Sequence, residues 1–264
     1  MTKLLSFMAA LVATGLLHTA HAAIKTETVK YKEGKTELTG YVAYDDSIKG
    51  PRPVVLIIHQ WMGLSANEKM RAEMLAKEGY LAFAVDIYGA ADTPKDISQA
   101  GNSAGKYKKD VALFRKRIKA GMDAIAKNPN ANIKSAVVAG YCFGGTGALE
   151  AARANLPVVG AVSFHGGLST PKPQDTKSIK SKVLVLHGAI DPYVPAAEVD
   201  GFMKEMNDAK ADYQFISYSG AVHAFTQKEA GNDPSQGAAY QEAADKRSWI
   251  AFMNFLNEVA PVTK

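Results

Sequence analysis

The chain has 264 residues, of which 47% are hydrophobic and 22% are charged. This length and composition provide enough apolar side chains for a large core and are typical of one globular domain. The net charge of +5 is a mild excess, and no nucleic-acid-binding motif accompanies it, so we exclude nucleic acid as a partner. The single cysteine excludes an internal disulfide bond.

The first 22 residues have the pattern of a signal peptide. Lys3 provides a basic start, an apolar stretch covers residues 4–17, and Ala20-His21-Ala22 matches an A-x-A cleavage site. The apolar stretch is shorter than the roughly 18 to 20 residues that a membrane-spanning helix needs. We therefore expect a cleaved leader over residues 1–22 and one domain over residues 23–264. The mature protein is expected to be exported, periplasmic or secreted, with no membrane span.

Beyond the leader, the sequence predicts a sheet that begins with an antiparallel pair of strands. Segments 24–31 and 36–44 alternate polar and apolar residues, as edge strands do. Short apolar runs then alternate with helical patterns, which indicates a mostly parallel sheet with helices on both faces. The expected strands are 54–58, 81–85, 133–139, 158–164, 183–186 and 213–218, and the expected helices are 66–78, 106–119, 143–155, 196–209 and 237–259.

Two long irregular stretches are predicted, at residues 89–105 and 167–179, where they are placed to rim a site. The basic segment after the first stretch has apolar residues at steps of three and four from Val111 to Ile125. Its lysines and arginines are therefore predicted to form the solvent-exposed face of an amphipathic helix.

The only cysteine stands in the most informative motif of the chain. Cys142 lies between Gly140 and Gly144, directly after the apolar run 133–139. A nucleophile held on a sharp turn from a strand into a helix needs small residues at these two positions. The helix predicted to begin at Phe143 favours the thiolate through the positive end of its dipole. We therefore predict that Cys142 is a catalytic nucleophile.

The base and the acid follow from the order of residues along the chain. In a hydrolase with this turn, the nucleophile is followed by an acid and then by a histidine. Between Cys142 and His223, only Asp191 follows a predicted strand by a short loop. We predict His223 as the base and Asp191 as the acid that orients its imidazole.

The oxyanion formed in acyl transfer needs two hydrogen-bond donors. With a nucleophile on such a turn, the donors are the backbone N–H of the next residue and one from the loop after an early strand. These positions correspond to Phe143 and to Trp61 or its neighbour Gln60, with Gly63 allowing the loop to turn back.

Two further patterns point to other chemistry but are weaker. Gly101 to Gly105 spells G-x-S-x-G around Ser103, but no apolar strand precedes it, so we interpret Ser103 as a loop or helix-cap residue. The histidines at the strand ends lack the spacing of a metal site, so we predict no metal. For His59 and His165 we predict hydrogen-bonded structural roles.

Four segments together resemble the dienelactone hydrolase family: the turn at Cys142, Val85-Asp86-Ile87-Tyr88, His187-Gly188-x-x-Asp191, and Gly220 to Phe225. The resemblance extends from about residue 54 to the C-terminus. It implies an α/β-hydrolase fold, with a mostly parallel central sheet, helices on both faces and antiparallel strands at the N-terminal edge. It also implies hydrolysis of a small-molecule ester or lactone by the triad Cys142, Asp191 and His223, without a cofactor.

The chain departs from this family at three positions near the expected site. Gln60 stands in place of the family's glutamate after the early strand, and Ala90 and Gln227 stand in place of two arginines that bind a substrate carboxylate. We therefore expect no strong preference for a carboxylate-bearing substrate. Arg71, Arg115 or a lysine within 89–105 are the alternative anchors.

Gln60, Tyr88 and Phe225 are predicted to line the substrate pocket, and the protein is expected to be a monomer. Two other functions fit the sequence. A non-catalytic binding protein is consistent with the missing arginines and with Gln60. A redox-sensing thiol protein needs only an accessible cysteine of low pKa.

Overall fold

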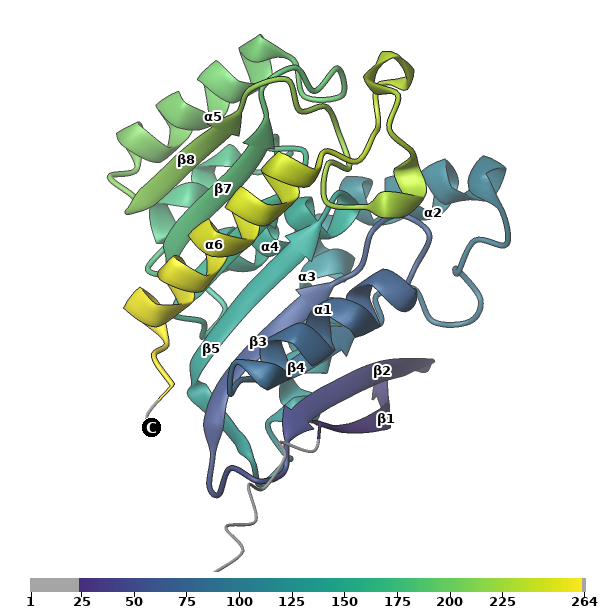
Figure 1. The fold of residues 1–264 in the computed structure, drawn as a ribbon, viewed down its shortest axis with the longest axis vertical. Helices are drawn as coiled ribbons and strands as arrows, with labels where there is room; N and C mark the ends of the chain where they lie inside the picture. The colour runs from purple at the N-terminus through teal and green to yellow at the C-terminus, as the bar shows by residue number, and fades with distance from the viewer. Residues whose placement is uncertain (1–23, 263–264) are drawn as a thin grey trace, which may run out of the picture.

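The computed structural model of the protein describes residues 24–262. Eight strands form one sheet in the order β1-β2-β4-β3-β5-β6-β7-β8 (Figure 1). β1 pairs antiparallel with β2, β2 pairs antiparallel with β4, and all other neighbours are parallel. The strands are β1 (Ile24–Glu33), β2 (Thr36–Asp45), β3 (Arg52–Ile58), β4 (Leu81–Val85), β5 (Ala131–Tyr141), β6 (Gly160–Phe164), β7 (Lys182–Gly188) and β8 (Tyr213–Tyr218).

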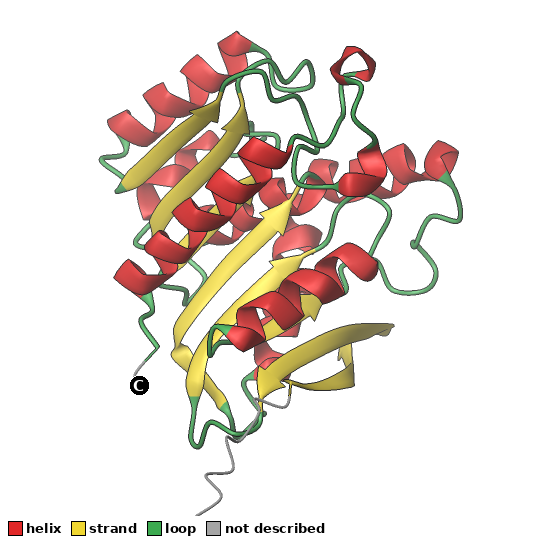
Figure 2. Cartoon of the chain, in the orientation of Figure 1, coloured by secondary structure: helices red, strands yellow, loops and turns green. Residues whose placement is uncertain are grey.

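Helices cover both faces of this sheet (Figure 2). α1 and α6 pack on one face against strand residues such as Val55 and Ile57, and the intervening Leu56 and Ile58 pack against α2 to α5 on the other. This alternation is the period of two that a strand covered on both faces requires. The helices are α1 (Ala66–Lys77), α2 (Ile97–Lys109), α3 (Val111–Ile125), α4 (Phe143–Arg153), α5 (Ala196–Asp208) and α6 (Glu242–Val259).

The expected α/β-hydrolase architecture is confirmed, with the antiparallel strands β1 and β2 at the N-terminal edge. β4 and β8 have the predicted bounds, and the other strands differ from the prediction only at their ends. The parallel strands β3, β5, β6 and β7 therefore end at one edge of the sheet, where the predicted catalytic residues follow them.

The structure corrects the prediction between residues 89 and 119. The expected loop 89–105 contains the beginning of α2, and the expected helix from residue 106 is divided at Asp110. Asp96 accepts a hydrogen bond from the Gln99 N–H, and Asp110 accepts one from the Leu113 N–H. Each aspartate caps the start of a helix, a role that polar composition alone does not distinguish from a loop.

Two smaller corrections lie in the C-terminal half. α6 begins at Glu242 instead of residue 237, because Gly237 has a φ of 79°, outside the right-handed helical region. Segment 167–179 contains the short 3₁₀ helix Pro173–Ser178 instead of being irregular throughout.

The predicted signal peptide, residues 1–22, lies outside the described residues. Export, the single domain over 23–264 and the monomeric state all stay predictions. Within residues 24–262, no helix is long and apolar enough to cross a membrane.

Candidate active site

Cys142 stands at the carboxyl end of the central strand β5, in the sharp turn that leads into α4. Its φ of 55° lies in the left-handed region, which residues with a side chain rarely adopt. A Cβ at Gly140 would lie 1.9 Å from the carbonyl oxygen of Gly144, and a Cβ at Gly144 would lie 2.1 Å from that of Ile58. Only glycine fits at both positions, so the sequence pattern around Cys142 has a steric cause.

Asp191 and His223 lie at the same edge of the sheet. Asp191 follows β7 and is buried, and His223 lies in the loop after β8. His223 Nδ1 is 2.8 Å from Asp191 Oδ2, and the His223 and Cys142 side chains are close enough to shift the pKa of one another. Asp191 Oδ1 accepts the N–H of Tyr193 at 2.9 Å, which holds the carboxylate on its other side. The structure thus brings together the three residues predicted as a triad.

These side chains alter the protonation of one another. Burial opposes ionisation of the Cys142 thiol, but the charge and hydrogen bond of His223, together with Lys108 and the Phe143 N–H, hold its pKa below the ordinary value. Burial lowers the pKa of His223, but the charge of Cys142 and the hydrogen bond to Asp191 outweigh burial and raise this pKa to about 10. Both shifts favour a thiolate beside an imidazolium, relative to an isolated thiol and imidazole.

The loop after β3 carries one of the two predicted oxyanion donors. The carbonyl oxygen of Trp61 accepts a hydrogen bond from Tyr88 Oη at 3.0 Å, and the Gly63 N–H donates to the Gln60 carbonyl at 3.1 Å. Among residues 24–262, no backbone carbonyl accepts a hydrogen bond from the Trp61 N–H. The other predicted donor, the Phe143 N–H at the start of α4, is close enough to the Cys142 thiol to lower its pKa.

Tyr88 and Phe225, which are predicted to line the substrate pocket, are both buried in the structure. Each residue is 0% exposed, and its role in the substrate pocket stays a prediction. Tyr88 supports the loop after β3, and the ring of Phe225 packs edge-on against His165 with 5.1 Å between centroids. Gln60 is nearly buried, and its Oε1 accepts the Met62 N–H at 2.8 Å, so its amide stabilises the same loop.

His59 and His165 are buried and hydrogen-bonded, as predicted for structural residues. Nδ1 of His59 is 2.6 Å from the Gln60 carbonyl oxygen, and its Nε2 accepts the Ile87 N–H at 3.2 Å. His165 bonds to the backbone of the nucleophile itself: its Nδ1 accepts the Cys142 N–H at 3.2 Å. His59 therefore fixes the loop after β3, and His165 fixes the turn after β5.

The arginines considered as anchors for a substrate anion are already occupied. Arg71 is buried and forms an ion pair with Asp245 at 2.6 Å. Arg115 forms ion pairs with Glu150 at 2.7 Å and with Asp175 at 2.6 Å. Neither guanidinium is free to bind a substrate.

Lys108 on α2 is a cation near the thiol that the sequence did not single out. Lys108 and Glu198 both lie close to Gly167. If Gly167 carried a Cβ, this atom would be 3.9 Å from Lys108 Nζ and 3.7 Å from Glu198 Oε1. The charge of Lys108 also contributes to the lowered pKa of Cys142. In the sequence, Lys108 is one of several lysines on the solvent-exposed face of a helix, so only the fold reveals its place.

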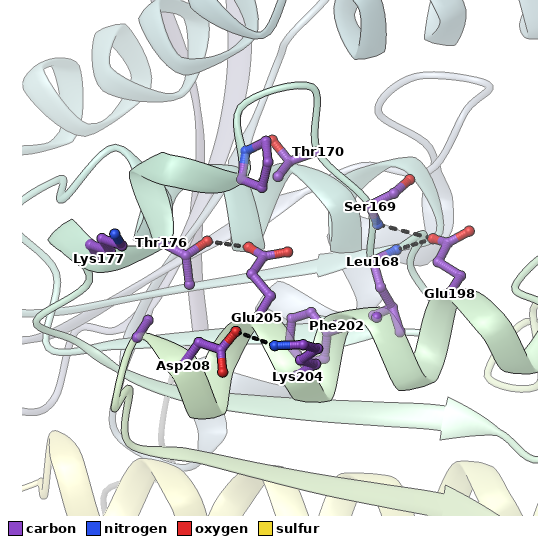
Figure 3. A pocket seen from close by; sticks show the side chains of 13 residues that line it. Leu168, Ser169, Thr170, Thr176, Lys177, Glu198, Phe202, Lys204, Glu205 and Asp208 are labelled. Carbon is purple, nitrogen blue, oxygen red and sulfur yellow. Dashed lines mark hydrogen bonds and ion pairs between the residues drawn. The ribbon is translucent and has the colours of Figure 1, made fainter.

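A cavity of about 450 Å³ lies between α5 and the 3₁₀ helix, and none of the three triad residues lines it (Figure 3). Oε1 of Glu198 accepts the N–H groups of Leu168 at 2.6 Å and of Ser169 at 3.0 Å, which fixes the segment after β6. Glu205, which also lines the cavity, is paired with Arg153 at 3.0 Å. Both carboxylates are therefore already bound within the protein, and neither is free to act on a ligand in this cavity.

Ser103, at the centre of the other G-x-S-x-G segment, lies inside α2 and not in a loop or at a cap. Its Oγ donates a hydrogen bond to the Asp92 carbonyl oxygen at 2.7 Å, which accounts for a serine there without catalysis. Among residues 24–262, no group of three or more His, Cys, Asp or Glu side chains is arranged to hold a metal ion.

Comparison with known proteins gives the same family as the sequence motifs. The model of the dienelactone hydrolase family matches residues 38–260. A putative carboxymethylenebutenolidase from Yersinia pestis is 29% identical over 72% of this chain and 74% of its own length. Another from Aquifex aeolicus strain VF5 is 28% identical over 83% of this chain and 95% of its own length.

Solved structures agree with these sequence relatives. A dienelactone hydrolase-like promiscuous phosphotriesterase from metagenomic libraries is 35% identical, with a TM-score of 0.85 over 90% of this chain and 99% of that chain. A putative dienelactone hydrolase from Klebsiella pneumoniae is 22% identical, with a TM-score of 0.70 over 88% of this chain and 98% of that chain, and shares the fold.

Proposed function

Because the chain belongs to the dienelactone hydrolase family, we propose that it hydrolyses a carboxylic ester or a lactone with Cys142 as the nucleophile. The observation that carries this proposal is the placement of Cys142 in the strained turn after β5, beside a His223 that is oriented by Asp191 at 2.8 Å. The chain has no second cysteine, so a sulfur nucleophile can only be Cys142.

In the proposed reaction, the Cys142 thiolate attacks the carbonyl carbon, and the electron pair of the C=O bond moves to its oxygen. When the tetrahedral intermediate collapses, the bond to the alcohol oxygen breaks, and the His223 imidazolium gives its proton to this oxygen. The acyl group is then held as a thioester on Cys142. With a lactone, the alcohol remains attached to the acyl chain.

Hydrolysis of the thioester restores the enzyme. Neutral His223 takes a proton from a water molecule as the water attacks the thioester carbonyl, and the C–S bond breaks to release the acid. Asp191 bonds Nδ1 of His223, so Nε2 is the nitrogen that exchanges protons at the site. The Phe143 N–H, the Trp61 N–H and the positive end of α4 are proposed to stabilise both oxyanions.

We expect an acyl group to be trapped on Cys142. Protein mixed with excess nitrophenyl ester and quenched in acid during the first turnovers should retain the thioester, because acid removes the base that deacylation needs. Mass spectrometry of the digested protein should find the acyl mass on the peptide that contains Cys142, and hydroxylamine should release it. As a control, protein alkylated beforehand at Cys142 should take up no acyl group. An acyl group on a serine would contradict the proposed nucleophile.

We expect Lys108 to give a modest preference for substrates that carry a second, negative group. Replacing Lys108 with methionine keeps the apolar stem and removes the charge. The ratio of kcat/KM for a carboxylate-bearing lactone to that for its neutral methyl ester should fall about fivefold, since an exposed charge pair contributes about 1 kcal/mol.

The matched control for this prediction is Lys109→Met, which removes the neighbouring exposed charge on α2. It should leave the ratio unchanged. An equal ratio in Lys108→Met and wild type would show that no substrate anion binds at Lys108.

A further inference from the structure

His165 is a buried titratable residue that the proposed reaction does not use. It directly follows β6, its side chain is 0% exposed, and its φ is 40°. Its Nδ1 lies 3.2 Å from the backbone nitrogen of Cys142, and its Nε2 lies 2.8 Å from Oγ1 of Thr226. Its ring stands edge-on to that of His223, with 5.3 Å between centroids. His165 therefore contacts the nucleophile, the base and the loop that carries the base.

These contacts determine which nitrogen of His165 carries the proton. A backbone N–H can only donate, so Nδ1 of His165 must accept from Cys142 and be unprotonated. The proton of the neutral ring then stands on Nε2 and is donated to Thr226 Oγ1. Burial, followed by the charge of His223, keeps the pKa of His165 well below its ordinary value, and Arg71 acts in the same direction.

Thr226 is itself anchored to two helices. Its carbonyl oxygen accepts a hydrogen bond from Arg71 of α1 at 3.0 Å, and the same guanidinium pairs with Asp245 of α6 at 2.6 Å. Thr226 and His223 lie in one loop after β8. His165 thus links the strained turn of Cys142 to the loop that carries His223 and Thr226. The ion-paired guanidinium of Arg71 holds the same loop against α1 and α6.

We propose that His165, held in its Nε2–H form by Thr226, is a positioning residue that fixes the backbone of Cys142 relative to the loop of His223. The inference rests on the proposed function, because it concerns the same nucleophile and base. In the other tautomer, Nδ1–H would face the Cys142 N–H, and two donors repel each other. The Cys142 N–H, which is shared between His165 Nδ1 at 3.2 Å and the Phe164 carbonyl at 3.0 Å, would keep only the Phe164 carbonyl, and the turn would relax away from His223.

Thr226→Val tests this inference, because valine keeps the shape of threonine and removes the hydroxyl that accepts from Nε2. We expect kcat to fall about tenfold with KM unchanged, because positioning acts on the reaction step and not on binding. The pH profile of iodoacetamide alkylation should also move to higher pH, with about tenfold slower labelling near pH 6, because a displaced thiolate is stabilised less by the charge of His223.

Thr226→Ser is the matched variant, since it restores the hydroxyl and removes only a methyl group. It should recover kcat and the alkylation profile to within about threefold of wild type. A merely structural role of Thr226 would lower thermal stability in both variants without moving the alkylation profile. If Thr226→Val keeps the wild-type profile and kcat, the proposed positioning is wrong.

The tautomer can be measured in the wild-type protein, so the inference remains testable even if Thr226→Val fails to fold. Long-range ¹H–¹⁵N NMR spectra should assign the His165 proton to Nε2 across neutral pH, and a proton on Nδ1 would overturn the inference. This result is independent of ester turnover. Failure of the proposed function would appear instead as full turnover after Cys142 is alkylated, whatever the tautomer of His165.

Discussion

Replacing Cys142 with alanine is expected to lower kcat on small esters and lactones by at least about a thousandfold, the scale on which a triad hydrolase loses activity with its nucleophile. Alanine keeps the Cβ of Cys142 and removes only the sulfur, so we expect the backbone of the strained turn to keep its conformation. The residual activity of Cys142→Ala would come from the oxyanion donors and from substrate binding, without a covalent intermediate. Initial rates on purified protein, together with circular dichroism of the fold, measure this loss.

The matched control is Ser103→Ala, at the centre of the second G-x-S-x-G segment. Ser103 lies inside α2 and bonds a backbone carbonyl, so we expect full activity from this variant. Unchanged turnover in Cys142→Ala with loss in Ser103→Ala would move the nucleophile to the serine and would overturn the proposed function.

The same variants separate the two alternative functions. A non-catalytic binding protein would show no ester turnover in wild type, and its thiol would alkylate only near the ordinary cysteine pKa of about 8.5. A redox-sensing thiol would alkylate readily and oxidise reversibly without turnover. Wild-type turnover that Cys142→Ala abolishes excludes both.

The parts of the site that the sequence predicted are those with a local cause. The glycines beside Cys142 are needed because a Cβ would collide with backbone atoms only a few residues away or on the neighbouring strand. Asp191 and His223 could be chosen because each follows a strand and because their order along the chain is fixed. These constraints act through chain order and backbone sterics, and both can be read from one sequence.

The parts that the sequence did not predict depend on packing between distant segments. Lys108 reaches the site because α2 ends near Gly167, and its sequence neighbourhood is that of any solvent-exposed lysine. Thr226 matters because His165, 61 positions earlier, points at it. The burial of Tyr88 and Phe225 also depends on tertiary contacts, because these contacts set the direction in which a loop side chain points.

Replacing His223 with alanine is expected to raise the pKa of Cys142 as well as to abolish turnover. In wild type, burial opposes the thiolate, and the charge and hydrogen bond of His223 are the largest effects that favour it. Without the imidazolium, only Lys108 and the Phe143 N–H oppose burial, so the thiol should titrate above about pH 8.5. Labelling by iodoacetamide near neutral pH should therefore slow by at least about tenfold.

Asp191→Asn tests whether the charge of His223 sets the pKa of Cys142, because it should give a pKa between those of wild type and His223→Ala. The imidazole remains, but the neutral amide no longer raises the pKa of His223 as the carboxylate does, so the imidazolium is less favoured. The alkylation profile of Asp191→Asn should fall between those of wild type and His223→Ala, while kcat falls by about a thousandfold or more because the tautomer of His223 is no longer fixed. If both variants alkylate like wild type, the low pKa of Cys142 comes from Lys108 and the start of α4, and the thiolate does not depend on His223.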